Sequence, residues 1–271
     1  MVNSEQLYDM LTHPELFFLI AGPCVIEDEY LMMQTAEYLK KITYERNLPF
    51  IFKSSFEKSN RTSVHSYSGP GLKKGLKLLK KIKDTFDLPI LTDVHETFEV
   101  DEVAEVADIL QIPAFLCRQT ALIAKAAKTN KIINIKKGQF LAPEDMHLQV
   151  EKVTTNDNFK VMLTERGASF GYHNLVVDFR SFALMKSNLY PIIYDVTHSM
   201  QRPSLSKTTG GTPEFAPMLA QAAIATGYVD GLFIETHPNP PEALSDANTQ
   251  LTLTVMPEIL DKCIAIKKAI K

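Results

Sequence analysis

Cysteine is scarce in this chain of 271 residues. Its three cysteines, Cys24, Cys117 and Cys263, are widely spaced and odd in number, which argues against a disulfide framework. Free thiols persist in a reducing compartment, so we expect a cytoplasmic protein. Internal repeats and low-complexity segments are missing as well.

Long hydrophobic runs are also missing, and no apolar stretch is long enough to span a bilayer. The first residues carry Glu5, Asp9 and Glu15 in place of the basic start and apolar core of a signal peptide. The net charge is only −3, which gives no reason to expect nucleic acid or an anionic membrane as a partner. A run of lysines over residues 73–83 is interpreted as the solvated face of a helix.

Apolar, β-rich segments alternate with helix-like segments along the chain. We predict strands at residues 16–24, 49–56, 89–96, 109–116, 132–139, 160–167, 191–199 and 231–238. We predict helices after them at residues 29–47, 71–86, 97–107, 119–130, 143–154, 176–187, 215–227 and 253–271. This alternation predicts right-handed βαβ units around a parallel sheet.

Eight such units in a row predict an α/β fold that closes into a (β/α)8 barrel, because barrels of about 250 residues often form one domain. We expect one barrel domain over residues 1–271 with a short N-terminal extension. Barrel enzymes build their chemistry at the C-terminal ends of the strands. Polar motifs lie at the C-terminal ends of three predicted strands, at Gly22–Cys24, Asp195–His198 and Glu235–His237. The chain is therefore predicted to be an enzyme.

Cationic side chains lie near the ends of three predicted strands, at Lys53, Lys136 and Arg166. Burying Lys or Arg is costly without an anionic partner, so a bound phosphate or carboxylate is a natural occupant of their common mouth. Salt bridges within the protein are an equally good interpretation of any single cation, with Asp93, Asp195 and Glu235 as the acidic partners. The three cations together favour an anionic substrate.

A second group of side chains combines a thiol, an imidazole and two carboxylates: Cys24, His198, Glu235 and Asp246. This mixture suits a divalent transition metal such as Zn²⁺ or Fe²⁺ better than Mg²⁺ or Ca²⁺. The spacing matches no local zinc-finger pattern, and a single cysteine at a strand end is more often a small buried core residue. The metal interpretation therefore requires the four side chains to meet at one mouth.

Two polar loops, residues 57–70 and 200–213, follow predicted strand ends and are candidate lids or substrate clamps. Gly210 and Gly211 form either a hinge within the second loop or a solvent-exposed turn.

Long and unusual motifs carry a resemblance that covers residues from about 19 to 253. They are IAGPCVIE (20–27), FKSSFEKSNRTS (52–63), TDVHE (92–96), PAFLCRQT (113–120), KKGQF (136–140), TERGASFGY (164–172), DVTHSMQRP (195–203) and FIETHPNPPEALSDANTQL (233–251). In these motifs the chain resembles the 3-deoxy-D-manno-octulosonate 8-phosphate synthases. This resemblance implies a transferase that joins phosphoenolpyruvate to arabinose 5-phosphate in lipopolysaccharide precursor biosynthesis.

The resemblance also implies roles for individual residues. Those implied to hold phosphoenolpyruvate are Lys58, Lys136 and Arg166. Those implied to contact arabinose 5-phosphate are Asn60 and Arg61. Those implied to line the same pocket are Lys53, Asp93 and Gln139. Arg118 would reach a sugar phosphate across a subunit boundary, within an implied homotetramer.

The family it resembles has metal-dependent members with Cys after Gly-Pro and metal-independent members with Asn there. The residue in this chain is Cys24, and SDANTQL (245–251) resembles the metal-dependent type. The implied ligands of a divalent Zn²⁺, Fe²⁺ or Mn²⁺ ion are Cys24, His198, Glu235 and Asp246. Residues with an implied catalytic role are Cys24, His198, Asp246 and Lys136. The chain departs from many relatives at Ser68, at Ala121 and over residues 204–212.

Two other functions compete with this one. A heptulosonate or sialic-acid-type synthase would use the same phosphoenolpyruvate site with another aldehyde, so Lys136 and Arg166 serve either reaction. A non-catalytic barrel that senses a phosphorylated metabolite would be expected to have lost a metal ligand or an anion-binding cation. None of these residues is lost here.

Overall fold

Eight parallel strands form a closed ring in the computed structural model, which describes residues 3–60, 65–186, 189–202 and 210–271. Their order around the ring follows the sequence, and the last strand pairs with the first. The strands are β1 (Phe18–Gly22), β2 (Phe50–Lys53), β3 (Ile90–Asp93), β4 (Ile109–Ile112), β5 (Ile132–Lys136), β6 (Val161–Glu165), β9 (Ile192–Asp195) and β12 (Gly231–His237).

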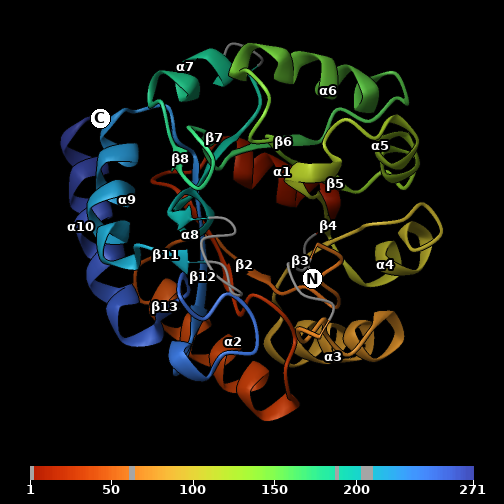
Figure 1. The fold of residues 1–271 in the computed structure, drawn as a ribbon, viewed down its shortest axis with the longest axis horizontal. Helices are drawn as coiled ribbons and strands as arrows, with labels where there is room; N and C mark the ends of the chain where they lie inside the picture. The colour runs from red at the N-terminus through yellow and green to blue at the C-terminus, as the bar shows by residue number, and fades with distance from the viewer. Residues whose placement is uncertain (1–2, 61–64, 187–188, 203–209) are drawn as a thin grey trace.

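Helices pack on the outside of this ring, which Figure 1 shows along the barrel. They are α2 (Glu29–Tyr44), α3 (Leu72–Phe86), α4 (Val100–Val106), α5 (Thr120–Ala127), α6 (Met146–Thr154), α7 (Arg180–Lys186), α9 (Ala216–Ala225) and α10 (Met256–Ala269). The predicted (β/α)8 barrel is thereby confirmed.

The strands of the ring are buried on both faces, which accounts for their near-continuous apolar sequences. Successive side chains of a strand point to opposite faces. In β1, Phe18 and Ile20 pack among the side chains inside the ring, whereas Leu19 and Ala21 pack in the shell between ring and helices. Two apolar layers therefore hold the strand ends in fixed positions.

A helix precedes the ring where we expected only a short extension. Helix α1 (Ser4–Thr12) places Leu7 and Leu11, one turn apart, against the apolar side chains inside the ring. The hydroxyl of Tyr8 donates a hydrogen bond to the carbonyl of Val161, with 3.0 Å between the oxygens. Because Val161 begins β6, α1 lies across the N-terminal end of the barrel and closes it.

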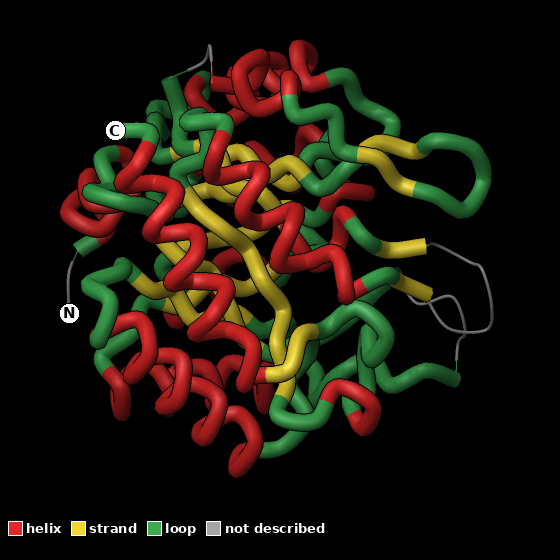
Figure 2. The backbone as a smooth tube through the Cα atoms, turned by 90° about the vertical axis from the view of Figure 1, so that its left-hand side faces the viewer, coloured by secondary structure: helices red, strands yellow, loops and turns green. Residues whose placement is uncertain are grey.

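The C-terminal end of the barrel carries two small hairpins that the sequence pattern does not predict. One joins β7 (Ala168–Ser169) to β8 (Leu175–Val176), and the other joins β10 (Gln201–Arg202) to β11 (Gly210–Gly211). Both project from the same end of the barrel on the right of Figure 2. A single helical turn, α8 (Val196–Ser199), directly follows β9.

Several predicted helix boundaries differ from the structure. Helix α7 begins at Arg180 and not at residue 176, because residue 176 belongs to the β7–β8 hairpin. Helices α4 and α10 begin three residues later than predicted, at Val100 and Met256. The remaining elements are β13 (Leu251–Thr252), η1 (Ala114–Leu116), η2 (Pro143–Asp145), η3 (Pro213–Phe215), η4 (Pro240–Glu242) and η5 (Leu253–Val255). Within the described ranges, no helix is long and apolar enough to cross a membrane.

Candidate active site

A cavity opens at the C-terminal ends of the strands, where most of the predicted site residues gather. Predicted residues in its wall are Lys53, Lys58, Asn60, Asp93, Lys136, Gln139, Arg166, His198 and Glu235. Further lining comes from Ser59, His95, Gln111 and residues 113–116. The cavity therefore combines cations, carboxylates, amides and imidazoles from seven different strands or their following loops.

The other predicted residues do not line this cavity. Cys24 and Asp246 lie next to Glu235, away from the cavity wall. Arg118 is exposed at the end of η1, where its carbonyl accepts a hydrogen bond from Lys152. Residue 61, and with it the predicted contact of Arg61, lies outside the described residues, as do residues 203–209 of the second predicted loop.

The loop that carries Cys24 lies against β2 because Gly22 has no side chain. A Cβ at Gly22 would overlap the carbonyl oxygen of Lys53, so only glycine allows this approach. The backbone N–H of Cys24 then donates to Gln250 Oε1 at 3.1 Å, and its carbonyl accepts from Lys53 Nζ at 3.0 Å. Cys24 is thereby fixed between β2 and the segment that carries Asp246.

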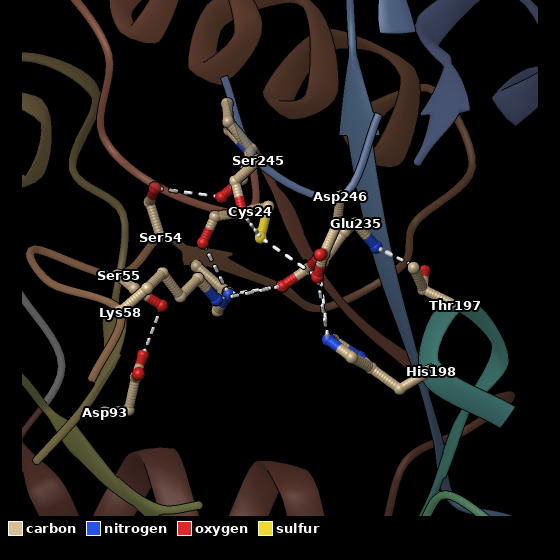
Figure 3. Close-up of polar contacts among 12 residues, drawn as sticks. Cys24, Ser54, Ser55, Lys58, Asp93, Thr197, His198, Glu235, Ser245 and Asp246 are labelled. Carbon is tan, nitrogen blue, oxygen red and sulfur yellow. Dashed lines mark hydrogen bonds and ion pairs between the residues drawn. The ribbon is translucent and has the colours of Figure 1, made fainter. Parts of the chain in front are cut away.

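The four predicted metal ligands come together at one place (Figure 3). Cys24 Sγ lies 3.5 Å from Asp246 Oδ2, and His198 Nε2 lies 3.6 Å from Glu235 Oε2 and 3.9 Å from Asp246 Oδ2. Ligand atoms at bond lengths of about 2.0–2.3 Å from a tetrahedral Zn²⁺ ion would be roughly 3.3–3.8 Å apart. The donor atoms of Cys24, Glu235 and Asp246 all lie within 4.8 Å of one another, and His198 lies beside Glu235 and Asp246 at slightly longer range. The donor chemistry is that of a transition-metal site.

Two observations show that this group is suited to a cation. Glu235 Oε2 is completely buried and has no hydrogen-bond partner, although a carboxylate oxygen normally accepts several hydrogen bonds. His198 Nδ1 lies 2.8 Å from Asp195 Oδ2, so an N–H at Nδ1 leaves the Nε2 lone pair directed at the other ligands. Burial and the neighbouring Asp246 and Glu235 charges raise the pKa of the Cys24 thiol well above its usual value. A bound cation would reverse this effect.

Asp246 has a backbone conformation that few residues adopt. Its φ of 48° lies in the left-handed region, which aspartate tolerates better than most residues. The carbonyl of Asp246 accepts hydrogen bonds from the N–H groups of Thr249 and Gln250, and these bonds hold the turn. The turn directs the Asp246 carboxylate toward Cys24 and His198.

Two of the three strand-end lysines and arginines pair with carboxylates of the protein. Lys53 Nζ lies 2.6 Å from Glu235 Oε1, and Lys136 Nζ lies 2.6 Å from Asp195 Oδ2. Burial would raise the pKa of Glu235, but the Lys53 and His198 charges hold it well below its usual value. Burial lowers the pKa of Lys136. These two lysines therefore form salt bridges within the protein, which was one of the two interpretations of the sequence.

Arg166 differs from the two lysines because no carboxylate within hydrogen-bonding distance satisfies it. Its Nη2 donates to Gln201 Oε1 at 2.9 Å, while its Nε and Nη1 are buried and have no hydrogen-bond partner among the described residues. Burial lowers the pKa of the guanidinium, so the charged form is held at a cost. Unpaired guanidinium N–H groups in a cavity wall are suited to a phosphate or carboxylate ligand.

A chain of polar contacts runs along another side of the cavity. Ser55 donates to Asp93 Oδ1 at 2.5 Å, and Asp93 Oδ2 lies 3.0 Å from His95 Nε2. Glu99 accepts a hydrogen bond from the backbone N–H of His95 and lies 3.7 Å from its Nδ1. Burial lowers the pKa of His95, but the hydrogen bond to Asp93 and the nearby Glu99 carboxylate outweigh it and raise the pKa to about 9. His95 therefore adds a positive charge to the cavity at neutral pH.

Several residues of this site were not predicted from the sequence, among them Ser245, Gln201, His95 and Gln250. Ser245 Oγ lies 2.9 Å from Cys24 Sγ, and Gln201 donates to Asp246. Their proximity depends on long-range folding, which residue spacing does not reveal. The one available signal was position, because Ser245 and Gln201 belong to quoted motifs at strand ends.

Known proteins of similar sequence identify the family of this chain. Residues 12–271 match the family model of the DAHP synthetase I family, and the chain belongs to this family. A relative from Dichelobacter nodosus, named 2-dehydro-3-deoxyphosphooctonate aldolase, is 55% identical over 94% of this chain and 92% of its own length. Relatives of the same name from Koribacter versatilis and Legionella pneumophila are 50% and 51% identical, over 95% and 94% of this chain and 93% of their own lengths. The resemblance that the sequence motifs predicted is confirmed.

Proposed function

We propose that this protein is a transferase that condenses phosphoenolpyruvate with D-arabinose 5-phosphate and water. The products are 3-deoxy-D-manno-octulosonate 8-phosphate and inorganic phosphate, for lipopolysaccharide precursor biosynthesis. The observation that carries this proposal is the buried Arg166 guanidinium with two unpaired N–H groups, in a cavity that also contains Lys53, Lys58 and Lys136. The names of the relatives support the same reaction.

The reaction requires two phosphorylated anions to lie side by side. A carbon–carbon bond forms between C3 of phosphoenolpyruvate and the aldehyde carbon, water oxygen adds at C2, and the C2–O bond to phosphate breaks. Arg166, Lys58 and Lys136 would bind the phosphoenolpyruvate anion and offset the repulsion between the substrates. Asn60 and Arg61 would contact the sugar phosphate, and Asp93 and Gln139 would line the same pocket.

Lys136 is suited to a second role. Burial lowers the pKa of its ammonium group, which makes Nζ a stronger acid than an exposed lysine. We expect Nζ to donate a hydrogen bond or proton to the departing phosphate oxygen. Asp195, 2.6 Å from Nζ, would hold the ammonium in position.

The residues that would hold a divalent Zn²⁺, Fe²⁺ or Mn²⁺ ion are Cys24, His198, Glu235 and Asp246. Such an ion, when bound, would polarise a water molecule or the aldehyde oxygen as a Lewis acid. Asp195 would keep the His198 imidazole oriented, and Lys53 would hold Glu235 through its other oxygen.

Phosphate release from phosphoenolpyruvate tests this proposal, measured with and without arabinose 5-phosphate and with and without EDTA. We expect release that needs the sugar, that EDTA abolishes and that added Zn²⁺, Mn²⁺ or Fe²⁺ restores. Cys24→Ser should lower the bound metal per chain, whereas Cys263→Ser, at a buried cysteine in α10, should leave the metal content unchanged. Activity that EDTA does not affect would remove the metal from the proposal and leave the condensation standing.

The aldehyde substrate needs a separate test, because the phosphoenolpyruvate site would serve several synthases. Erythrose 4-phosphate and N-acetylmannosamine are the comparison substrates in the same phosphate-release assay. We expect kcat/KM with arabinose 5-phosphate to exceed both by at least about a hundredfold, since the site would be built for its chain length and phosphate. A preference for erythrose 4-phosphate would reassign the reaction to the heptulosonate branch.

Arg118 belongs to the assembly part of the proposal. Its exposed position outside the cavity is compatible with a contact to a sugar phosphate in another subunit of a homotetramer. We also propose that the chain acts as one barrel domain in the cytoplasm. Light scattering on the purified protein gives the mass of the assembly, and Arg118→Ala should raise KM for arabinose 5-phosphate if the subunits share sites.

A further inference from the structure

Gln201 forms a bridge between the anion-binding arginine and the metal-ligand group. Its Oε1 accepts a hydrogen bond from Arg166 Nη2 at 2.9 Å, and its Nε2 donates to Asp246 Oδ2 at 3.2 Å. The orientation of the amide is fixed by chemistry, because a guanidinium only donates and a carboxylate only accepts. The proposed function assigns no role to this residue.

The backbone of Gln201 is held close to the turn that carries Asp246. The side chain is 9% exposed, and its backbone pairs with Gly211 in the β10–β11 hairpin. Gly211 itself packs against the turn that carries Asp246, since a Cβ there would overlap the Thr249 side chain. The hairpin is therefore held against the Asp246 turn by backbone as well as by the amide.

Each of the two groups that Gln201 connects contains a buried polar atom without a hydrogen-bond partner among the described residues. Arg166 has two buried N–H donors without a partner, and Glu235, 3.6 Å from His198, has a buried oxygen without one. An anion at Arg166 would fix the guanidinium, and a cation at the four ligands would fix the Asp246 carboxylate. Each event would hold one end of the Gln201 amide in the position that the other event requires.

We propose that Gln201 is a positioning residue that couples phosphoenolpyruvate binding at Arg166 to divalent metal binding at Asp246. The inference rests on the proposed function, because it needs both ligands to bind. Coupling between two ligands is reciprocal, so metal raises the affinity for phosphoenolpyruvate by the same factor by which phosphoenolpyruvate raises the affinity for metal. Gln201 touches neither reacting carbon in this scheme and acts through its two neighbours.

Two equilibrium measurements on the full chain test this coupling without turnover, because the sugar is left out. Zn²⁺ affinity is measured by competition with a chromophoric chelator, with and without phosphoenolpyruvate. Phosphoenolpyruvate affinity is measured by calorimetry, with and without Zn²⁺. For the unmodified protein we expect each ligand to raise the affinity for the other by about tenfold, a typical coupling between sites.

Gln201→Met keeps the length of the side chain and removes both hydrogen bonds, and Gln201→Asn keeps the amide but is too short to contact both partners. In each variant we expect the coupling factor to fall to about threefold or less, because only the through-space attraction of the two ligands remains. Gln221→Met is the matched control, since this glutamine on α9 donates to the Pro217 carbonyl of its own helix, away from the cavity. Its coupling should equal that of the unmodified protein.

The outcomes separate the two proposals. A tenfold coupling that persists in a folded Gln201→Met or Gln201→Asn protein would overturn the role of Gln201 and leave the proposed function intact. Failure of the unmodified protein to bind either Zn²⁺ or phosphoenolpyruvate would overturn the proposed function itself. Lower affinity for both ligands with unchanged coupling would show that Gln201 only stabilises the fold, and would also contradict the inference.

Discussion

At the N-terminal end of the barrel, α1 closes the interior with Leu7 and Leu11, whereas at the C-terminal end buried lysines, an arginine and carboxylates fill the space within the ring. Fully burying a leucine side chain stabilises the folded state by about 1.5–3 kcal/mol. Leaving a donor of a buried charged group unpaired costs roughly 1–3 kcal/mol. The apolar contacts of α1 therefore stabilise the folded state, whereas the unpaired charged groups at the cavity end destabilise it.

The difference between the α1 end and the cavity end predicts different effects of mutations at the two ends. Substitutions at the α1 end should lower the free energy of unfolding and leave the kinetics unchanged. Substitutions of unpaired groups at the cavity end, such as Arg166, should lower activity and leave stability unchanged or improved, whereas groups paired there, such as His95, also contribute stability. The following variants test whether the two ends of the barrel differ in this way.

The largest effect should come from Arg166→Leu. We expect kcat/KM for phosphoenolpyruvate to fall by about a thousandfold, because the variant loses a charged fork that would contact the substrate. The melting temperature should stay the same or rise, since two unpaired buried N–H donors disappear. Steady-state kinetics and calorimetric melting check both parts. Arg180→Leu, at an exposed arginine paired with Asp178, is the control and should change neither. A clear loss of stability in Arg166→Leu would break the contrast.

Leu11→Ala should have the opposite pattern. The leucine is completely buried against the inside of the ring, so we expect a loss of about 2–5 kcal/mol in the free energy of unfolding. Chemical denaturation measures this loss, and KM and kcat at 25 °C should be those of the unmodified protein. Met10→Ala, one residue earlier and 39% exposed, should cost much less. A kinetic effect of Leu11→Ala would mean that the two ends communicate.

The pH dependence of stability should carry a contribution from His95 at the cavity end. Its folded-state pKa of about 9 lies above the ordinary value of 6.5. Its contribution is therefore fully present below pH 6.5 and is lost as the pH rises through 9, by up to about 3 kcal/mol. Denaturation curves of the unmodified protein and His95→Gln between pH 6 and 10 should converge at the alkaline end. Curves that stay parallel would contradict the raised pKa.

Tyr8→Phe should give the smallest effect. It removes one hydrogen bond, to the carbonyl of Val161, and keeps the aromatic side chain that packs against the apolar residues inside the barrel. We expect a loss of about 1 kcal/mol in stability with unchanged kinetics, by the same denaturation and rate measurements. Thr12→Val is a useful comparison, since its hydroxyl bonds within α1 and does not reach the barrel. Equal losses in both variants would show that helix α1, and not its docking, sets the effect.

The fold could be predicted because each strand is an apolar run with its own length and end. Residues 132–139 were predicted as one strand, for example, and β5 covers Ile132–Lys136 with all five residues buried. Helix α1 could not be predicted as a closure, because its two buried leucines give a stripe too short to distinguish from an exposed extension. The β7–β8 hairpin was missed because two-residue strands have no period.

The site could be predicted in composition and only partly in geometry. The thiol, imidazole and carboxylates were expected at one mouth, because parallel strands all end on the same side. The structure places Cys24, Glu235 and Asp246 together and His198 beside them, and their role as metal ligands stays a prediction. The sequence left open whether Lys53 and Arg166 pair within the protein. The structure pairs Lys53 with Glu235 and leaves Arg166 without a carboxylate. Such differences depend on which side chains are long enough to meet across the barrel. The contacts of Gln201 could not be predicted for the same reason.

The close approach at Gly22 has a consequence for anyone who wishes to redesign the acceptor specificity of this protein. Every side chain larger than hydrogen would push the Cys24 loop away from β2, so a mutant library that includes this codon would consist largely of broken members. Positions 59 and 60, exposed at the cavity wall, carry no such restriction. Randomisation there explores substrate choice while the metal-ligand group stays assembled.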